Sequence, residues 1–139
     1  MFRTTADTNI YICGLIFPGA SRRFLQLARQ GAFELAISNV ILDEVVDVLQ
    51  RRFSMPLVEA LENSSYVESF TRRVHPTRTI NFVQEDPDDD RILECAVENA
   101  SDFIVSYDKD LLRRRRFEGI SIIKVEVFLQ LGFETKQAP

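Results

Sequence analysis

The sequence contains one histidine and two cysteines in 139 residues. The histidine, His75, precedes Pro76 in a polar stretch, so we expect it at the surface. This scarcity excludes histidine-based catalytic triads and most zinc chemistry. Cys13 and Cys95 stand among apolar residues and lack the spacing of a zinc site, so we expect buried, reduced thiols.

The sequence also lacks a run of apolar residues long enough to span a membrane. The first apolar run, residues 10–17, is too short for a signal peptide and ends at Pro18. We therefore expect a cytoplasmic protein with no membrane partner. No repeat or low-complexity linker divides the chain, which predicts one domain over residues 1–134 and a flexible tail over residues 135–139.

Strand and helix signals alternate along the chain, which predicts an α/β fold of three layers, α/β/α, with a central, mostly parallel sheet. We expect Ser21 to cap the first helix and Gly31 to end it. A break is expected near residues 63–65. The expected strands are residues 2–8, 33–38, 102–108 and 120–126, with an extended piece at 78–83, and the expected helices are 21–31, 39–53, 56–74, 88–100 and 127–133.

Polar side chains follow two of these strands. Asp7 ends the first strand beside Thr8 and Asn9, and Ser106 and Asp108 end the strand that starts near residue 102. In open parallel sheets the functional crevice lies at the carboxyl ends of the strands. A lone aspartate at a strand end is also a common turn former, so these residues become candidates only in combination.

The helix expected over residues 39–53 carries Glu44 on its apolar side. Ile41 precedes Glu44 by three residues and Val48 follows it by four, whereas Asp43 and Asp47 share the polar side. A carboxylate on a buried face is costly unless a partner or a metal ion satisfies it. Glu44 is therefore a candidate functional residue.

The acidic run of residues 85–90 opens the next helix. Asp86 precedes Pro87, which predicts Asp86 as N-cap and Pro87 at the first helical position. Asp88 and Asp90 would gain from the helix dipole, with Asp90 on the flank of the apolar stripe. Asp89 is placed on the buried face because it precedes the stripe at helical spacing; the stripe comprises Ile92, Leu93, Ala96, Val97 and Ala100.

Several carboxylates that converge repel one another unless a cation lies among them. Oxygen ligands of this kind select Mg²⁺ or Mn²⁺. Such ions clamp a phosphoryl displacement in which water is the nucleophile. The pattern therefore indicates metal-assisted phosphoryl chemistry.

These pieces together resemble the PIN domain of metal-dependent nucleases, particularly the VapC-like toxins of prokaryotic toxin–antitoxin modules. The matching pieces are "ADTNIYI", the inward Glu44, "DPDDDRILECA" and "FIVSYDKDLL", in that order over residues 4–112. The resemblance implies a Mg²⁺- or Mn²⁺-dependent endoribonuclease acting on RNA, with an antitoxin protein as partner and a tendency to form homodimers.

By match to the motifs, the resemblance implies an acidic catalytic and metal-binding cluster, with Asn9 and Ser106 as polar supports. Asp110 is a further candidate support, whose alternative role is to cap a helix that begins at Leu111. Asp90 is the rival to Asp89, because the motif match leaves the register ambiguous by one residue. The cluster comprises Asp7, Glu44, Asp89 and Asp108.

Arginines recur in pairs and in the run Arg113–Arg116. One interpretation is a solvated helix surface. The other is contact with the RNA backbone by Arg113 and Arg114, since this run follows Asp108 closely and the arginine fork suits phosphate. The net charge of −4 excludes a protein that binds nucleic acid over its whole surface, but a local basic patch remains compatible with it.

Other protein classes share single features of this sequence. An aspartyl-phosphate phosphatase also begins from an aspartate at a strand end, but it requires a second aspartate at the position of Asn9. A phospho-receiver domain requires an acidic pair and a mid-chain acceptor that are not evident. A catalytically silent PIN-like module that binds RNA or protein is the non-enzymatic alternative, which the intact acids disfavour.

Overall fold

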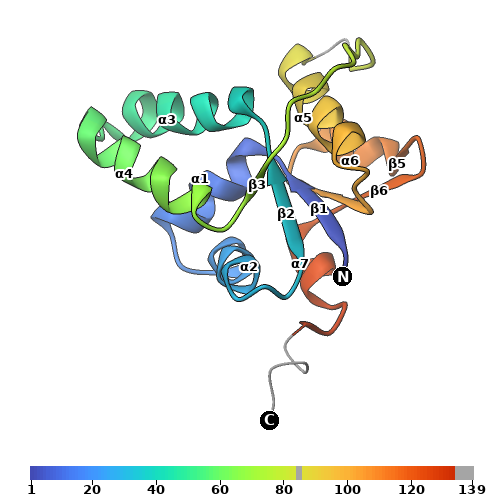
Figure 1. The fold of residues 1–139 in the computed structure, drawn as a ribbon, viewed down its shortest axis with the longest axis horizontal. Helices are drawn as coiled ribbons and strands as arrows, with labels where there is room; N and C mark the ends of the chain where they lie inside the picture. Colours follow the sequence, from blue (N-terminus) through green and yellow to red (C-terminus); the bar gives the residue numbers. More distant parts are fainter. Residues whose placement is uncertain (84–85, 134–139) are drawn as a thin grey trace.

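A six-stranded sheet lies at the centre of the protein in the computed structural model, which describes residues 1–83 and 86–133 (Figure 1). Its order is β3-β2-β1-β4-β6-β5, and every neighbouring pair is parallel except β5 and β6. The predicted α/β class is confirmed. The strands are β1 (Arg3–Ala6), β2 (Glu34–Ile37), β3 (Arg72–Arg73), β4 (Phe103–Val105), β5 (Arg116–Phe117) and β6 (Ile120–Ile123).

Helices cover both faces of this sheet. Figure 1 shows the first four helices on one side and the next two on the other, with the last beside α2. This arrangement gives the expected three layers. The helices are α1 (Thr8–Ile16), α2 (Ala20–Arg29), α3 (Asn39–Phe53), α4 (Leu57–Glu68), α5 (Pro87–Glu98), α6 (Lys109–Arg114) and α7 (Val125–Leu129).

The register between β1 and β4 determines where the polar strand ends meet. Ala6 pairs with Val105, and the backbone N–H of Asp7 donates to the carbonyl of Val105 at 3.1 Å. The chain leaves β1 toward β2 on one side, and β4 pairs on the other side, so a topological switch point lies between β1 and β4. The residues directly after these two strands therefore lie side by side at the crevice.

Helix α1 was not predicted. It occupies the apolar run after Asp7, and Asn9 is its one exposed residue, because the other residues face the sheet, α2 or α3. A helix that is buried almost all round has no apolar stripe at helical spacing. Its apolar composition therefore explains both why the sequence shows no helical pattern for α1 and why α1 has a central position in the fold.

Several predicted local features are wrong. Gly19, not Ser21, stands at the N-cap of α2, and Ser21 is buried in its first turn. Helix α4 runs through residues 63–65 without a break. The extended piece expected over residues 78–83 belongs to no strand of the sheet and is tied to α5, where the N–H of Ile80 donates to the Glu94 carboxylate at 2.8 Å. The edge strand lies earlier, at β3.

The predictions about histidine and cysteine are largely confirmed. His75 is exposed and Cys95 is buried, but Cys13 is only partly buried; both thiols are free. Among the described residues, no helix combines the length and apolar character that a membrane crossing requires. The tail expected over residues 135–139 lies outside the described residues.

An aromatic cluster closes the end of the sheet opposite the crevice. Phe128 of α7 stacks on Phe133 with ring centroids 4.8 Å apart and meets Phe24 of α2 and Phe33 edge-on, while Phe24 and Phe33 form a tilted pair. Aromatic contacts of this kind each add about 0.5–1.5 kcal/mol beyond the apolar area that they bury. This aromatic cluster thus packs the end of the domain that lies away from the polar strand ends.

The close approach of α1 to α2 depends on Gly14. A Cβ added there would lie 2.5 Å from Leu25 Cδ1 and 2.9 Å from the carbonyl oxygen of Ser21. We expect Gly14→Ala to lower the free energy of unfolding by about 1–2 kcal/mol, because the steric cost exceeds the gain in helix propensity. Urea unfolding measures this, with Cys13→Ala on the same helix as control; equal stability of both variants would contradict the packing role.

Candidate active site

Asp7 is held rigidly at the switch point. It caps α1, and its Oδ1 accepts the backbone N–H of Asn9 at 2.9 Å. Its Oδ2 accepts a short hydrogen bond from the hydroxyl of Ser106. Asp7 is only 5% exposed, so these bonds fix a carboxylate that has little access to water.

Asp108 lies beside Asp7 and caps α6. Its Oδ1 accepts the backbone N–H groups of Asp110 at 2.7 Å and Leu111 at 3.2 Å, while its own N–H donates to Ser106 Oγ at 2.9 Å. Ser106 therefore links the carboxylate of Asp7 to the backbone N–H of Asp108. The capping role that was the alternative for Asp110 belongs to Asp108, and Asp110 pairs with Arg113 at 2.9 Å.

The start of α5 separates the acids as the sequence indicated. Asp86 is the N-cap, and its Oδ1 accepts the backbone N–H of Asp88 at 3.1 Å, with Pro87 in the first turn. Asp89 and Asp90 are both buried. The Asp90 Oδ1 accepts the N–H groups of Phe82 and Val83 at 3.0 and 2.8 Å, whereas Asp89 Oδ2 is buried without a hydrogen-bond partner among the described residues.

Three carboxylates from two segments form a tight cluster. One oxygen from each of Asp86, Asp89 and Asp108 lies within 4.8 Å of the other two. Asp86 and Asp108 each use Oδ1 as a helix cap. Each of these two residues has a second oxygen, and Asp89 Oδ2 has no hydrogen-bond partner among the described residues, so the three side chains could supply ligands to a cation.

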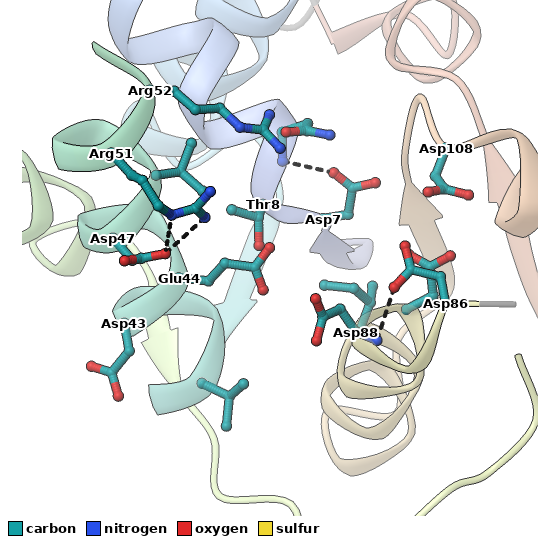
Figure 2. Close-up of a pocket in the computed structure, with 15 residues that line it drawn as sticks. Asp7, Thr8, Asp43, Glu44, Asp47, Arg51, Arg52, Asp86, Asp88 and Asp108 are labelled. Carbon is teal, nitrogen blue, oxygen red and sulfur yellow. Dashed lines mark hydrogen bonds and ion pairs between the residues drawn. The ribbon is translucent and has the colours of Figure 1, made fainter. Parts of the chain in front are cut away.

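Glu44 lies on the opposite wall, on α3 (Figure 2). Burial raises its pKa above the ordinary value, and the Asp88 carboxylate contributes to the same effect. The side chain points across the cavity toward the first turn of α1, where Thr8 stands (Figure 2). Glu44 therefore belongs to the same acidic site, although it is not part of the tight cluster.

The two walls enclose a cavity of about 490 Å³. Eight carboxyl groups and two guanidinium groups line it, together with a few neutral side chains. The lining residues are Asp7, Thr8, Asn9, Val40, Asp43, Glu44, Asp47, Val48, Arg51, Arg52, Asp86, Asp88, Asp89, Ile92 and Asp108.

Two of these acids have raised pKa values. Burial raises the pKa of Asp7 to about 6, although the bonds from Ser106 and Asn9 oppose the rise. Burial, together with the carboxylates of Asp108 and Asp86, raises the pKa of Asp89 to about 8. Asp7 and Asp89 thus resist ionisation at this site, through burial and through neighbouring carboxylates.

A divalent cation fits this donor set. The oxygens of Asp86, Asp89 and Asp108 are hard ligands, and Asp89 Oδ2 is an orphaned buried polar atom. An unpartnered buried polar group costs about 1–3 kcal/mol, which a bound cation would relieve. Zinc is not favoured, since the cluster offers neither thiolate nor imidazole.

Comparison with known proteins gives the family. A family model described as "PIN domain" matches residues 3–110, which include all the acids of the tight cluster. The chain belongs to the PIN domain family. The search of curated proteins found no match.

A solved structure shares the fold of this PIN domain. A chain in the crystal structure of VapBC2 from Rickettsia felis, bound to a DNA fragment from their promoter, superposes with a TM-score of 0.62. The two chains are 13% identical, and the match covers 86% of this chain and 96% of that chain. At this identity the likeness establishes the fold alone.

The PIN domain brings the four predicted acids to one cavity. Asp7, Glu44, Asp89 and Asp108 all line it, and Asn9 supports Asp7 through its backbone N–H. Sequence reasoning missed the place of Asp86 in the tight cluster, because its role as a cap was a sufficient explanation. It also missed the exposed row Asp43 and Asp47, which lines the cavity although it was assigned to solvent.

The arginine run lies elsewhere. Arg113 pairs with Asp110, and the guanidinium of Arg114 lies 4.7 Å from the ring centroid of Phe82. Neither residue lines the acidic cavity, whose basic side chains are Arg51 and Arg52. Contact of Arg113 and Arg114 with the RNA backbone stays a prediction.

The raised pKa of Asp89 predicts an unusual dependence of stability on pH. The folded chain binds a proton at about pH 8 that the unfolded chain binds near 3.8, so stability falls as the pH rises between these values. In the presence of a chelator, we expect the melting temperature to fall from pH 5 to pH 8. Asp89→Asn keeps the shape and removes the charge, so its melting temperature should exceed that of the wild type at pH 8.

Thermal unfolding by circular dichroism measures this difference. Each kcal/mol corresponds to about 3–5 °C in a domain of this size. Asp43→Asn is the matched control, because Asp43 lines the same cavity from an exposed position. Equal pH profiles for the wild type and Asp89→Asn would show that Asp89 carries no buried charge.

Proposed function

We propose that this PIN domain is a Mg²⁺- or Mn²⁺-dependent endoribonuclease that hydrolyses RNA phosphodiester bonds with water as the nucleophile. The observation that carries the proposal is the cluster of Asp86, Asp89 and Asp108, in which Asp89 presents a buried oxygen without a partner. PIN domains are generally nucleases, and the family match covers this site.

Each residue of the site has a distinct part in this reaction. Asp89 and Asp108, with the free oxygen of Asp86, would hold the cation, and Asp7 and Glu44 would complete the acidic cluster from β1 and α3. Ser106 keeps Asp7 oriented. When bound, the cation supplies Lewis acidity that lowers the pKa of water and offsets charge on the phosphodiester.

We further propose that the protein acts as the toxin of a toxin–antitoxin pair in the cytoplasm. The fold is shared with a chain of the VapBC2 complex, which supports an antitoxin protein as partner. Homodimerisation and a single domain over residues 1–134 belong to the same proposal. A catalytically silent binding module is the alternative, and a phosphatase is a weaker one.

Cleavage of RNA tests the activity directly. Purified protein incubated with mixed RNA should cleave it with Mn²⁺ or Mg²⁺ and not with a chelator. Asp7→Asn should reduce the rate of cleavage more than about 100-fold, because it removes one of the carboxylates that complete the acidic cluster around Asp86, Asp89 and Asp108. Asparagine is also a good N-cap, so α1 keeps its start.

Gel analysis of the products, with inductively coupled plasma measurement of bound metal, provides the readout. Equal activity in Asp7→Asn would identify a contaminating nuclease and contradict the proposal. Metal binding without cleavage of any RNA would favour the silent module. Release of phosphate from small phosphate esters, with RNA left intact, would favour the phosphatase.

The adjacent acids Asp89 and Asp90 provide a second test. Asp89→Asn should lose cleavage and metal binding, because Asp89 contributes an oxygen to the tight cluster and its buried Oδ2 has no partner among the described residues. Asp90→Asn should retain both, since the asparagine carbonyl can still accept the N–H groups of Phe82 and Val83. Both are measured as cleavage rate and bound metal; activity lost in Asp90→Asn and kept in Asp89→Asn would reverse the assignment.

A further inference from the structure

Two neighbouring arginines of α3 differ in what they contact. Arg51 is bound by Asp47, with Nε and Nη2 at 3.0 and 2.8 Å from Asp47 Oδ2. Arg52 also lines the acidic cavity, yet its guanidinium has no hydrogen bond or ion pair with any of the described residues. A cation that lines a cavity with eight carboxyl groups and bonds to none of them remains available to an incoming anion.

The helical geometry explains this difference. Asp43, Asp47 and Arg51 are spaced by four residues and form one row along α3, which gives Arg51 its partner one turn back. Val40, Glu44, Val48 and Arg52 form the neighbouring row. The residue one turn before Arg52 is therefore the apolar Val48, which offers no acceptor.

Arg52 also has a suitable position. It lies eight residues after Glu44, or about 12 Å along the helix axis at about 1.5 Å per residue. Its long side chain extends from α3 toward α1 and Asp7, whereas the side chain of Arg51 points toward Asp47 (Figure 2). The guanidinium thus lies at the margin of the acidic cluster rather than inside it.

We propose that Arg52 is a substrate-binding residue that contacts a phosphate of single-stranded RNA adjacent to the phosphodiester bond that is cleaved. This inference rests on the proposed ribonuclease function and specifies how its site holds the substrate. A planar fork of donors suits two phosphate oxygens. The contact would give α3 a basic subsite at the acidic cavity, separate from the run Arg113–Arg116.

The test compares Arg52→Gln with Arg51→Gln. Both substitutions remove one positive charge from the same cavity and the same last turn of α3, so they change the long-range field about equally. Any excess effect of Arg52→Gln therefore reports direct contact. Both residues are exposed, so neither change disturbs the core, and Arg52→Lys keeps the charge without the fork.

Binding is measured by fluorescence anisotropy with a short, labelled single-stranded RNA of mixed sequence, with Ca²⁺ in place of Mn²⁺ to prevent turnover. We expect Arg52→Gln to weaken binding about 5–10-fold. The slope of log K against log salt should fall by about 0.7, the value for one phosphate contact on a single strand. Arg51→Gln should change both much less, and Arg52→Lys should recover part of the affinity.

The outcomes separate this inference from the proposed function. Metal-dependent cleavage by the wild type, with equal binding losses in Arg52→Gln and Arg51→Gln, would overturn the role of Arg52 and leave the nuclease intact. The same holds if neither variant loses affinity. A wild type that neither binds nor cleaves RNA with any of these metals would overturn both proposals.

Discussion

The parallel register of β1 and β4 is the constraint on which the site depends. It places Asp7 directly beside the segment from Ser106 to Asp108, at the topological switch point where the order of the strands reverses. Carboxylates in such proximity repel one another, and the raised pKa values of Asp7 and Asp89 record that repulsion together with burial. The fold must therefore supply compensating interactions if the cluster is to persist before a cation binds.

Helix capping supplies much of this compensation. Asp7, Asp86 and Asp108 are the N-caps of α1, α5 and α6, so three of the clustered acids accept backbone N–H groups at helix starts. Each cap contributes about 0.5–2 kcal/mol. Each of these acids therefore has two roles, because it begins a helix and also lines the acidic cavity. Asp89 has no such second role, and it is the acid with the strongly raised pKa.

The sequence was most informative where one face of an element differs from the other. The apolar stripe of α5 was enough to separate Asp89 from Asp88, and α3 has the predicted bounds. Helix α1 was missed because it is buried almost all round and so shows no helical period. The contribution of Asp86 was missed for another reason: proximity to Asp108 depends on how two segments pack, which neither segment encodes alone.

Arg52 shows both what the spacing within one helix predicts and what depends on the packing of several elements. In the sequence, Arg51 and Arg52 are two adjacent positive charges with nothing to distinguish them. The spacing along α3, however, gives Arg51 an acidic partner one turn back, Asp47, and gives Arg52 an apolar neighbour, Val48. What the spacing does not show is that this end of α3 borders the cavity, because that depends on the packing of α3 against α1 and α5.

The excess of negative charge in the cavity connects the proposed binding of a metal ion with the proposed binding of RNA. Two guanidinium groups cannot offset eight carboxyl groups, so a polyanion meets a repulsive surface in the free protein. A divalent cation changes this balance most strongly at Asp89, where burial makes an unneutralised charge most costly. If the proposed metal ion and RNA bind here, we expect positive coupling between them, since each would reduce the electrostatic cost of binding the other. In its proposed role, Arg52 would contribute to that coupling from the margin of the cavity, because it adds positive charge there and is not one of the residues that would hold the cation.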